Sequence, residues 1–495
     1  MKRFFSIIGG LVSVYAGLII AILMSTDAKF VIFGTDVLIF ILVLGISSYA
    51  VYAKSKIHLL EPWKYVFQRP LAMSALVILL AYVFIGLLDS IHFRTSLESI
   101  EHQETKSYSG EVISIFDVLT SSLKSRQEKS YLSPFATHLY VKETVETDSG
   151  TIRDYPRLKY GGAHLNDPVN DRSLDIIVST IIGLIKGSLF WIVICGLTVF
   201  WLTGWRKDKF KAQLHATLQA DEFIPYRVIL ATLGFIVMFA FLALEFADKY
   251  HVFGTDKVGQ DVFYLALKSI RTGLVIGTLT TLIMLPFAVA LGVTAGHFGG
   301  WVDDVVQYIY TTLSSIPGVL LIAAAILSLQ VYIANNPELF ETISERADLR
   351  LLFLCAILGI TSWTGLCRLL RGETLKLREL EYVHAAKAFG VGNTKIITKH
   401  ILPNVMHIVL IVVVLDFSSL VLAEAVLSYV GVGVDPTTNS WGNMINSARL
   451  EMAREPVVWW SLVAAFIFMF VLVLSANLFS DAVRDAFDPK VSRSK

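Results

Sequence analysis

Charged side chains are scarce in this sequence of 495 residues. Asp, Glu, Lys and Arg together make 17% of the chain, whereas apolar residues make 55% and the mean hydropathy is +0.63. Soluble domains are more polar than this, so the composition predicts an integral membrane protein in contact with lipid. There are 42 basic and 41 acidic side chains, and this balance offers no basis for nucleic-acid binding.

Cysteine is also scarce, and its positions exclude a disulfide framework. Cys195, Cys355 and Cys367 fall in or beside apolar runs, with neither a pairing nor a metal-ligand spacing. We interpret them as small buried hydrophobes. A metal site is not predicted from His384, His400 and His407 either, because these histidines fall on different short elements.

The motifs of several enzyme classes are missing. The phosphate-cradling pattern G-x-x-x-x-G-K-[ST] does not occur, so the chain cannot supply ATP hydrolysis by itself. The patterns H-E-x-x-H and G-x-S-x-G are missing as well. We therefore predict that the chain is not an enzyme and that it binds no cofactor of its own.

Ten apolar runs are long enough to cross a membrane, which predicts an all-α polytopic membrane protein. The first run could be a cleaved signal peptide, but its length and the poor cleavage site that follows favour a retained helix. Pro317 lies inside the seventh run and predicts a kink there. The runs cover 4–24, 31–52, 71–88, 176–201, 228–246, 274–295, 308–331, 351–370, 405–430 and 457–478.

Short basic loops set the expected orientation. Clusters of Lys and Arg lie at 54–69, 206–211, 368–378 and 484–495, and such clusters remain on the cytoplasmic side. Ten spans with both termini in the cytoplasm satisfy all four clusters.

The order of these features divides the chain into four parts. Residues 1–90 hold three helices, and 91–175 form a polar, extracytoplasmic soluble insertion. Residues 176–225 add a fourth extra helix and a basic linker, and 226–491 contain six spans. The insertion is compatible with a passive surface segment and with a docking module.

The polar stretch 381–404 lies between two long apolar runs and has a predicted shape. Tyr382–Phe389 has the spacing of a short amphipathic helix, and Gly390 is a plausible left-handed stop. A second short helix is expected from Asn393 to His400, and Pro403 then starts the next span. A helix resting on lipid head groups is the alternative interpretation.

This stretch resembles the cytoplasmic loop of ABC importer permeases, whose pattern is E-A-A, three residues, Gly, nine residues, Ile, one residue, Leu, Pro. Five residues match in register, and two depart from the pattern: His384 stands in the place of Glu and His400 in the place of Ile. The matching residues are Ala385, Ala386, Gly390, Leu402 and Pro403.

Three further motifs resemble the dipeptide and oligopeptide branch of these permeases. One, F-G-T-D-x-x-G-x-D-V, contains Gly254, Thr255 and Asp256, with Gln260 in the place of Arg. Asp481–Pro489 is similar to the ending of that branch. The motif S-W-G-N-M contributes Ser440, Trp441, Gly442 and Asn443. The resemblance covers roughly 226–491 and includes a coupling loop at 378–404.

The resemblance implies the permease subunit of a binding-protein-dependent ABC transporter in a bacterial cytoplasmic (inner) membrane. It implies import of di- or oligopeptides by alternating access, together with a second permease, two ATPase subunits that hold ATP and Mg²⁺, and an extracytoplasmic solute-binding protein. The solute stays open, because nickel, glycosides and antimicrobial peptides use similar permeases. The sequence also leaves open whether the two permease subunits are identical or different.

Asp416 and Glu424 are the acids to consider inside the ninth span. Eight residues apart, they lie about 80° apart around an α-helix, so both can face the interior of a bundle. One interpretation is a proton relay, which together with Lys186 would make a stand-alone proton-coupled secondary transporter. The other is a pair of polar anchors between helices or along a watery path, and the resemblance favours it. A membrane scaffold with a degenerate loop is a third interpretation.

Overall fold

The computed structural model describes residues 28–55, 57–97, 108–147, 150–204 and 224–487. Within these ranges, nine helices are long and apolar enough to cross a membrane. They correspond to the second to tenth predicted runs, so the all-α polytopic fold is confirmed. The first predicted run, 4–24, lies outside the described residues.

The N-terminal region supplies three helices beside the six-helix core. They follow the short strand β1 (Lys29–Val31) and are α2 (Gly34–Ser55), α3 (Ile57–Gln68) and α4 (Pro70–Asp89). Pro70 begins α4, where its missing N–H is not needed. Helix α4 packs against α10 and α18, and the Tyr82 hydroxyl donates a hydrogen bond to the Phe468 carbonyl at 2.9 Å.

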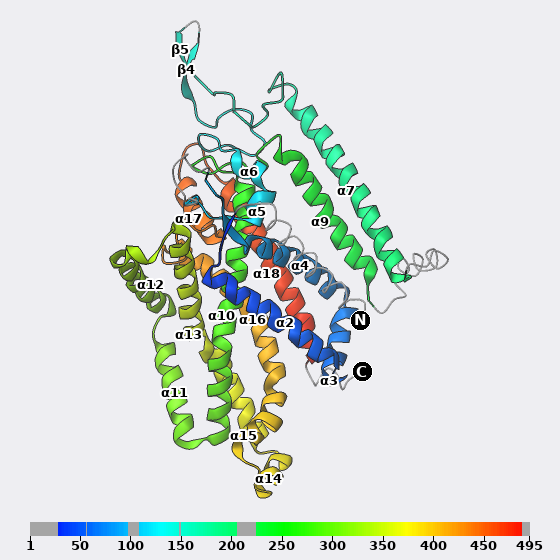
Figure 1. Cartoon of the computed structure of the whole chain (residues 1–495), viewed down its shortest axis with the longest axis vertical. Coiled ribbons are helices and arrows are strands. Elements are labelled where there is room, and N and C mark those ends of the chain that lie inside the picture. The colour runs from blue at the N-terminus through cyan, green and yellow to red at the C-terminus, as the bar shows by residue number, and fades with distance from the viewer. Residues whose placement is uncertain (1–27, 56, 98–107, 148–149, 205–223, 488–495) are drawn as a thin grey trace.

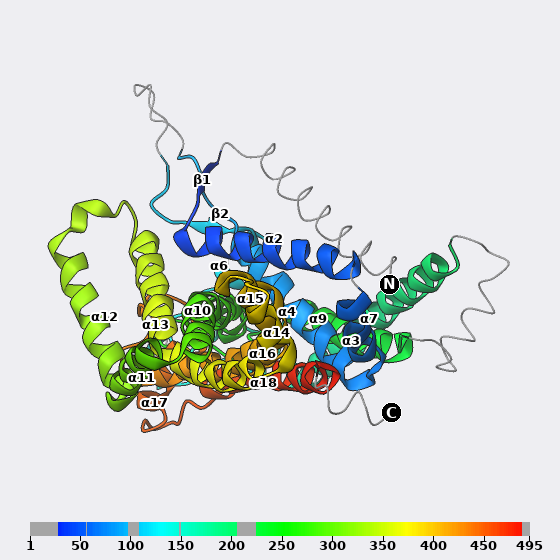
Figure 2. The same ribbon diagram turned by 90° about the horizontal axis from the view of Figure 1, so that it is seen from below.

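Helices α7 (Arg172–Leu202) and α9 (Tyr226–Ala247) form an antiparallel pair on one side of the molecule, opposite α11 and α12 (Figures 1 and 2). Gly183 and Gly187 let the two backbones approach closely, because a Cβ at either glycine would lie 3.1 Å from an atom of α9. The Lys186 ammonium lies 2.7 Å from the Glu245 carboxylate on α9. Lys186 therefore has an ionic partner within the helix pair.

Of the six spans predicted for 226–491, the first is α9, which lies beside α7. The other five form the core: α10 (Val262–Phe298), α11 (Gly300–Ser315) with α12 (Gly318–Asn335) in place of one run, α13 (Ile343–Arg378), α16 (Leu402–Tyr429) and α18 (Trp460–Phe487). The single turn η2 (Pro337–Leu339) precedes α13, and the short helix α17 (Trp441–Glu451) precedes α18. The interruption predicted at Pro317 is observed, but it is a break between two helices and not a kink within one. Ile316 is extended, with ψ near 129°. An extended residue before proline relieves the clash with the proline ring and ends α11.

Pro403 lies in the first turn of α16, as predicted, but no break separates this helix from the short helix before it. Helix α15 (Asn393–Ile396) passes into α16 through a π turn, η3 (Ile397–Ile401), so one continuous helical element covers 393–429. Pro403 has no N–H for a bond to the preceding turn, and its ring would clash with the carbonyl four residues earlier. The wider π turn in front of Pro403 accommodates this defect without ending the helix.

The insertion contains two small sheets and two short helices. Strand β2 (His92–Arg94) pairs antiparallel with both β1 and β3 (Ile113–Ser114), and α5 (Ile115–Leu119) and α6 (Ser121–Ser125) follow. Strands β4 (Glu143–Thr147) and β5 (Gly150–Asp154) form a hairpin that projects from the end of the molecule (Figure 1). We call this end, which carries the insertion, the outer end.

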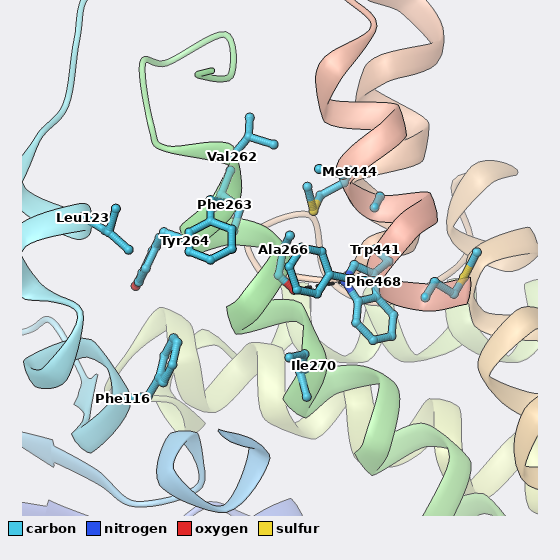
Figure 3. Close-up of a cluster of buried hydrophobic side chains, with 14 of the residues drawn as sticks. Phe116, Leu123, Val262, Phe263, Tyr264, Ala266, Ile270, Trp441, Met444 and Phe468 are labelled. Carbon is cyan, nitrogen blue, oxygen red and sulfur yellow. Dashed lines mark hydrogen bonds between the residues drawn. The ribbon is translucent and has the colours of Figure 1, made fainter. Parts of the chain in front are cut away.

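A cluster of buried apolar side chains joins the insertion to the core (Figure 3). Phe116 and Leu123 come from the insertion and share this cluster with residues of α10, α17 and α18. The rings of Phe116 and Tyr264 stack with centroids 6.4 Å apart. The Trp441 indole donates a hydrogen bond to the Ala266 carbonyl at 3.0 Å. The insertion therefore shares a core with the six-helix region.

Candidate functional site

The predicted site residues lie at opposite ends of the molecule. The coupling loop, with α14 (Glu381–Ala388) and α15, forms the inner end, whereas the insertion and α17 lie at the outer end (Figure 1). The structure therefore does not bring the coupling loop together with the residues around Gly254 and Ser440. They form two separate sites.

The end of α14 is closed by a Schellman motif. The Val391 amide donates to the Ala386 carbonyl and the Gly390 amide to the Lys387 carbonyl, at 3.0 and 2.9 Å. Gly390 has φ near +74°, and no atom lies within 4 Å of the position that a Cβ would take. Glycine is therefore required here by backbone conformation, not by lack of space.

One face of α14 is anchored in a buried cluster. Val383 is fully buried together with Ile396, Ile401 and Val405, and Ala386 packs against this cluster. Leu402 also packs against it, whereas Pro403 is exposed. The cluster includes side chains from α10, α11 and α13, so α14 is fixed to several core helices at once.

The opposite face of α14 is exposed, and small residues, Ala385 and Ala388, alternate on it with polar ones. Ala385 is exposed, and His384 is exposed with its Nε2 3.5 Å from the Glu379 carboxylate. Phe389 at the end of the helix is 87% exposed. Sequence reasoning did not single out Phe389 as a site residue, although an aromatic residue directly before the stop glycine was a usable signal. A bare helix face ending in an exposed aromatic ring is suited to insertion into a cleft of another protein.

Polar contacts hold the coupling loop to the core. The Asn404 amide donates to the Tyr382 hydroxyl at 3.2 Å, which connects α14 to the start of α16. Asn393 lies 3.2 Å from the His297 ring at the end of α10. The Arg371 guanidinium donates to Asp303 at 2.7 Å and connects α13 to α11. A displacement of α14 would therefore be passed to these helices as a unit.

At the outer end, the residues around Gly254 form a loop that the insertion covers. The Thr255 hydroxyl donates to the Ser130 carbonyl at 2.7 Å, and the Thr255 carbonyl accepts from the Trp460 indole at 2.8 Å. Asp256 accepts from the amides of Val258 and Gln260, at 3.0 and 2.8 Å. The loop thus connects the insertion with the first turn of α18.

The second outer motif caps α17 and holds it against α16. The Ser440 hydroxyl accepts from the Asn443 amide at 3.0 Å as an N-cap. The Asn443 side chain donates to the carbonyls of Asp435 and Thr438, both at 2.9 Å. At Gly442, a Cβ would lie 2.6 Å from Ser428 on α16, so only glycine allows this close contact.

The two acids of α16 have different surroundings. Glu424 is buried, and its carboxylate accepts from the Ser428 hydroxyl at 2.7 Å. Asp416 is half-buried, and the Ser419 hydroxyl donates to its backbone carbonyl. Among the described residues no hydrogen bond connects the two carboxyl groups, so the structure does not assemble them into a proton relay.

A buried charge cluster that sequence reasoning missed holds the insertion to α10. Asp117 of the insertion contacts the Lys268 ammonium and accepts from the Tyr264 hydroxyl at 2.7 Å. Lys268 also lies 3.1 Å from Asp89. These residues are far apart in the chain, so only the fold brings them together.

Asp117 makes the attachment of the insertion dependent on pH. Burial alone would raise the pKa of Asp117, but the Lys268 ammonium and the hydrogen bonds from Lys268, Tyr264 and Ser114 hold it below the usual value of 3.8. A lowered pKa stabilises the folded state at pH above 3.8, and this stabilisation is lost as pH falls through the folded-state value.

We therefore expect Asp117→Asn to lower the stability of the insertion at pH 7 by about 1.5–3 kcal/mol, because it removes the charged partner of the Lys268 and Tyr264 hydrogen bonds while Asp89 still pairs with Lys268. Below the folded-state pKa the variant and the unchanged protein should converge. Hydrogen exchange of the β2–β3 amides would measure both effects. Glu146→Gln, at an exposed position on the hairpin, is the control. An Asp117→Asn protein with unchanged exchange at pH 7 would contradict the assignment.

With nine described spans and a polar loop anchored to their inner ends, the molecule is a polytopic membrane protein by architecture. Residues 288–493 match the family described as binding-protein-dependent transport system inner membrane component. The chain belongs to this family, since it also matches curated members at 30% identity or more over most of their length.

Three relatives illustrate the similarity. The dipeptide transport system permease protein DppC of Lactococcus lactis subsp. cremoris is 33% identical over 245 residues, 50% of this chain and 65% of that protein. The oligopeptide transport system permease protein OppC of Mycobacterium bovis is 32% identical over 244 residues, 49% of this chain and 77% of that protein. The glutathione transport system permease protein GsiD of Pectobacterium atrosepticum is 30% identical over 247 residues, 50% of this chain and 75% of that protein.

The chain thus spans just under two thirds of the length of the Lactococcus relative and three quarters of the other two. About half of this chain lies outside each of these matches. The comparisons agree with the prediction that the chain is a membrane permease and is not itself an enzyme.

Proposed function

We infer that this chain is the membrane subunit of an ATP-driven importer that carries di- or oligopeptides across the bacterial inner membrane. The observation that carries the proposal is α14, which presents an exposed face while its buried face is fixed to α10, α11 and α13. The names of the relatives, transport system permease proteins for dipeptides, oligopeptides and glutathione, support a peptide substrate.

The proposed partners follow from the parts that this sequence lacks. Two ATPase subunits would bind ATP and Mg²⁺, since the chain has no phosphate-binding motif of its own. A second permease subunit would complete the pathway, and an extracytoplasmic binding protein would deliver the solute at the outer end. The basic loops favour an orientation with both termini and α14 in the cytoplasm.

In the proposed mechanism, the chain converts closure of the ATPases into a tilt of helices. A cleft of an ATPase subunit would hold the exposed face of α14, including Ala385 and Phe389. Because α14 is anchored through Val383 and the Tyr382–Asn404 contact, its movement would be passed to α13 and α16. The pathway would then open to one side in each nucleotide state. The preference of each state for one side is set by the coupling free energy between the nucleotide site and the pathway.

The exposed ring at the end of α14 provides a direct test. Phe389→Ala should weaken capture of the ATPase subunits at least about tenfold, because a buried aromatic anchor typically contributes 2 kcal/mol or more to an interface. Affinity is measured with the purified complex in detergent. Phe298→Ala, which removes a half-exposed ring at the inner end of α10, is the matched control. Equal losses in the two variants would count against the assignment of α14 as the docking element.

The proton-coupled alternative has less support, because Asp416 and Glu424 share no hydrogen bond among the described residues. Uptake into vesicles that contain this chain alone, under a proton gradient and without ATPase subunits, would favour the alternative. We expect no uptake there, and ATP-dependent uptake once the partner subunits are added.

A further inference from the structure

A polar cavity of about 180 Å³ lies at the outer end, at the junction between the N-terminal region and the six-helix core. Its walls come from both parts, so neither part forms it alone. The N-terminal region and the insertion contribute Phe33, Asp89, His92 and Val112. The core contributes Lys268, Arg271 and Thr272 of α10 and the segment Thr437–Asn439. It also contributes residues from the start of α13, namely Ile343, Ser344, Ala347, Asp348 and Leu351.

The groups in and behind the walls carry an excess of negative charge. Four buried carboxylates face two permanent cations, Lys268 and Arg271. Lys124 lies 3.8 Å from Asp117 and 2.6 Å from Glu111. Because the charges of Lys124 and Glu111 cancel, including both residues does not change the net charge of the cluster. Even with His92 protonated, the cluster keeps a net negative charge. The carboxylates are Asp36, Asp89, Asp117 and Asp348.

Asp348 is the carboxylate of the four with no cation at ion-pair distance among the described residues; the Arg271 guanidinium acts on it from behind the Thr35 hydroxyl, to which it donates at 2.9 Å. Asp36 has the Arg271 guanidinium at 2.6 Å, and Asp89 has the Lys268 ammonium at 3.1 Å. Asp348 contacts the hydroxyl and the amide of Thr35, while no ion pair joins it to a described residue. A buried carboxylate that lacks a cation is costly, so this wall of the cavity is suited to a positive ligand.

His92 provides a second, independent indication of a ligand. Its side chain is 9% exposed and lines the cavity, and its Nδ1 lies 2.9 Å from Asp36. The hydrogen bond that the described residues give the His92 ring is the one through Nδ1. When Nδ1 donates to Asp36, Nε2 is the acceptor nitrogen of the ring, so it can accept from a ligand N–H that reaches it.

We propose that this cavity binds a primary ammonium group, carried by a small aliphatic amine or by the N-terminus of a peptide. An ammonium has three N–H donors, which suit the Asp348 carboxylate and His92 Nε2 as acceptors. The apolar side chains of Phe33, Ile343 and Leu351 would contact the carbon chain attached to the ammonium. A metal ion fits less well, because no group of three or more potential ligand side chains is arranged for one among the described residues.

The volume agrees with this ligand class. A cavity of about 180 Å³ has room for several waters at roughly 30 Å³ each, and therefore for an ammonium with a short carbon chain. It does not hold a whole oligopeptide. The site does not depend on the proposed transport function, because ligand binding to the isolated chain can be measured without ATPase subunits.

The test uses the full-length chain in lipid nanodiscs, with n-butylammonium chloride as the probe in titration calorimetry. We expect saturable binding, and none with n-butanol, which has the same shape without the charge. Asp348→Asn should weaken binding at least about tenfold, because it removes one partner of a buried charge pair. Glu338→Gln, an exposed acid at the same end, is the matched control and should bind as the unchanged protein does.

Ser344→Leu offers a second variant that reduces the cavity without changing its charge, in case Asp348→Asn disturbs folding. It should also abolish binding, while size-exclusion and melting profiles stay unchanged.

Competition separates the two ligand sources. Dialanine with a free N-terminus displaces the probe if the site accepts peptides, and N-acetyl-dialanine does not. If neither displaces it, the site is specific for free amines.

The proposal is overturned by any of four results: no saturable binding of n-butylammonium, equal binding of n-butanol, equal displacement of the probe by sodium ions, or unchanged affinity in both Asp348→Asn and Ser344→Leu. Failure of ATP-dependent uptake would bear on the proposed function alone, because the titration contains neither ATP nor partner subunits.

Discussion

Gly390→Val should uncouple ATP hydrolysis from peptide uptake while leaving the chain inserted and folded. At φ near +74°, a β-branched residue costs about 1–2 kcal/mol, although no atom obstructs its Cβ. That cost shifts the population of the native turn by a factor of roughly 5 to 30. The Schellman bonds of Gly390 and Val391 would weaken, and α14 would lose its fixed angle to the core.

The measurement compares ATPase activity and uptake in proteoliposomes that contain all proposed subunits. We expect the ratio of transported peptide to hydrolysed ATP to fall about tenfold, since the turn population falls by a similar factor. Gly392→Val is the matched control. Gly392 is also exposed, with open space around its Cβ position, but its φ near −63° suits any residue. Full coupling in Gly390→Val, or equal losses in both variants, would contradict the proposed role of the turn.

The membrane spans could be predicted from the sequence because their signal is local. A run of apolar residues is visible without knowledge of its neighbours, and the nine described helices correspond to nine predicted runs. The end of α14 at Gly390 could be predicted for the same reason, because the residue in the left-handed conformation directly after a helix is usually glycine.

The sequence did not predict how the two prolines are accommodated. Pro317 and Pro403 are both helix-breaking residues, yet the chain breaks at the first and continues past the second. The difference lies in the preceding backbone, extended at Ile316 and widened into a π turn at Ile397–Ile401. The outcome therefore depends on packing around each proline.

The charge cluster at the outer end was out of reach for a similar reason. Arg271 and Asp36 are 235 residues apart, and Asp117 and Lys268 are 151 residues apart. Neither spacing carries a signal, because the contacts arise only when the insertion and α2 pack against α10. The insertion, which the sequence left open as a passive segment or a docking module, shares a core with the six-helix region.

Gly259→Ala should displace the insertion from the outer loop. A Cβ at Gly259 would lie 1.8 Å from the Glu128 carbonyl oxygen, and φ there is near +78°. The neighbouring atoms belong to the backbone, so no side-chain rotation relieves the overlap. Overpacking of this kind costs about 1–3 kcal/mol, in addition to the strain of a left-handed alanine. The Glu128–Gly259 hydrogen bond at 3.0 Å would be lost with the displacement.

Proteolysis of the insertion measures the displacement, because cleavage follows the population of the open form. We expect cleavage to be roughly 5- to 150-fold faster in Gly259→Ala. Gly431→Ala is the control for a left-handed alanine elsewhere at the outer end, since Gly431 has φ near +86° but no atom within 4 Å of its Cβ position. Gly431 does not contact the described residues of the insertion, so the insertion of this variant should be cleaved at the unchanged rate. Equal cleavage in all three proteins would contradict the prediction that the insertion rests on the Gly259 loop, and would leave contacts such as Asp117 with Lys268 to hold it in place.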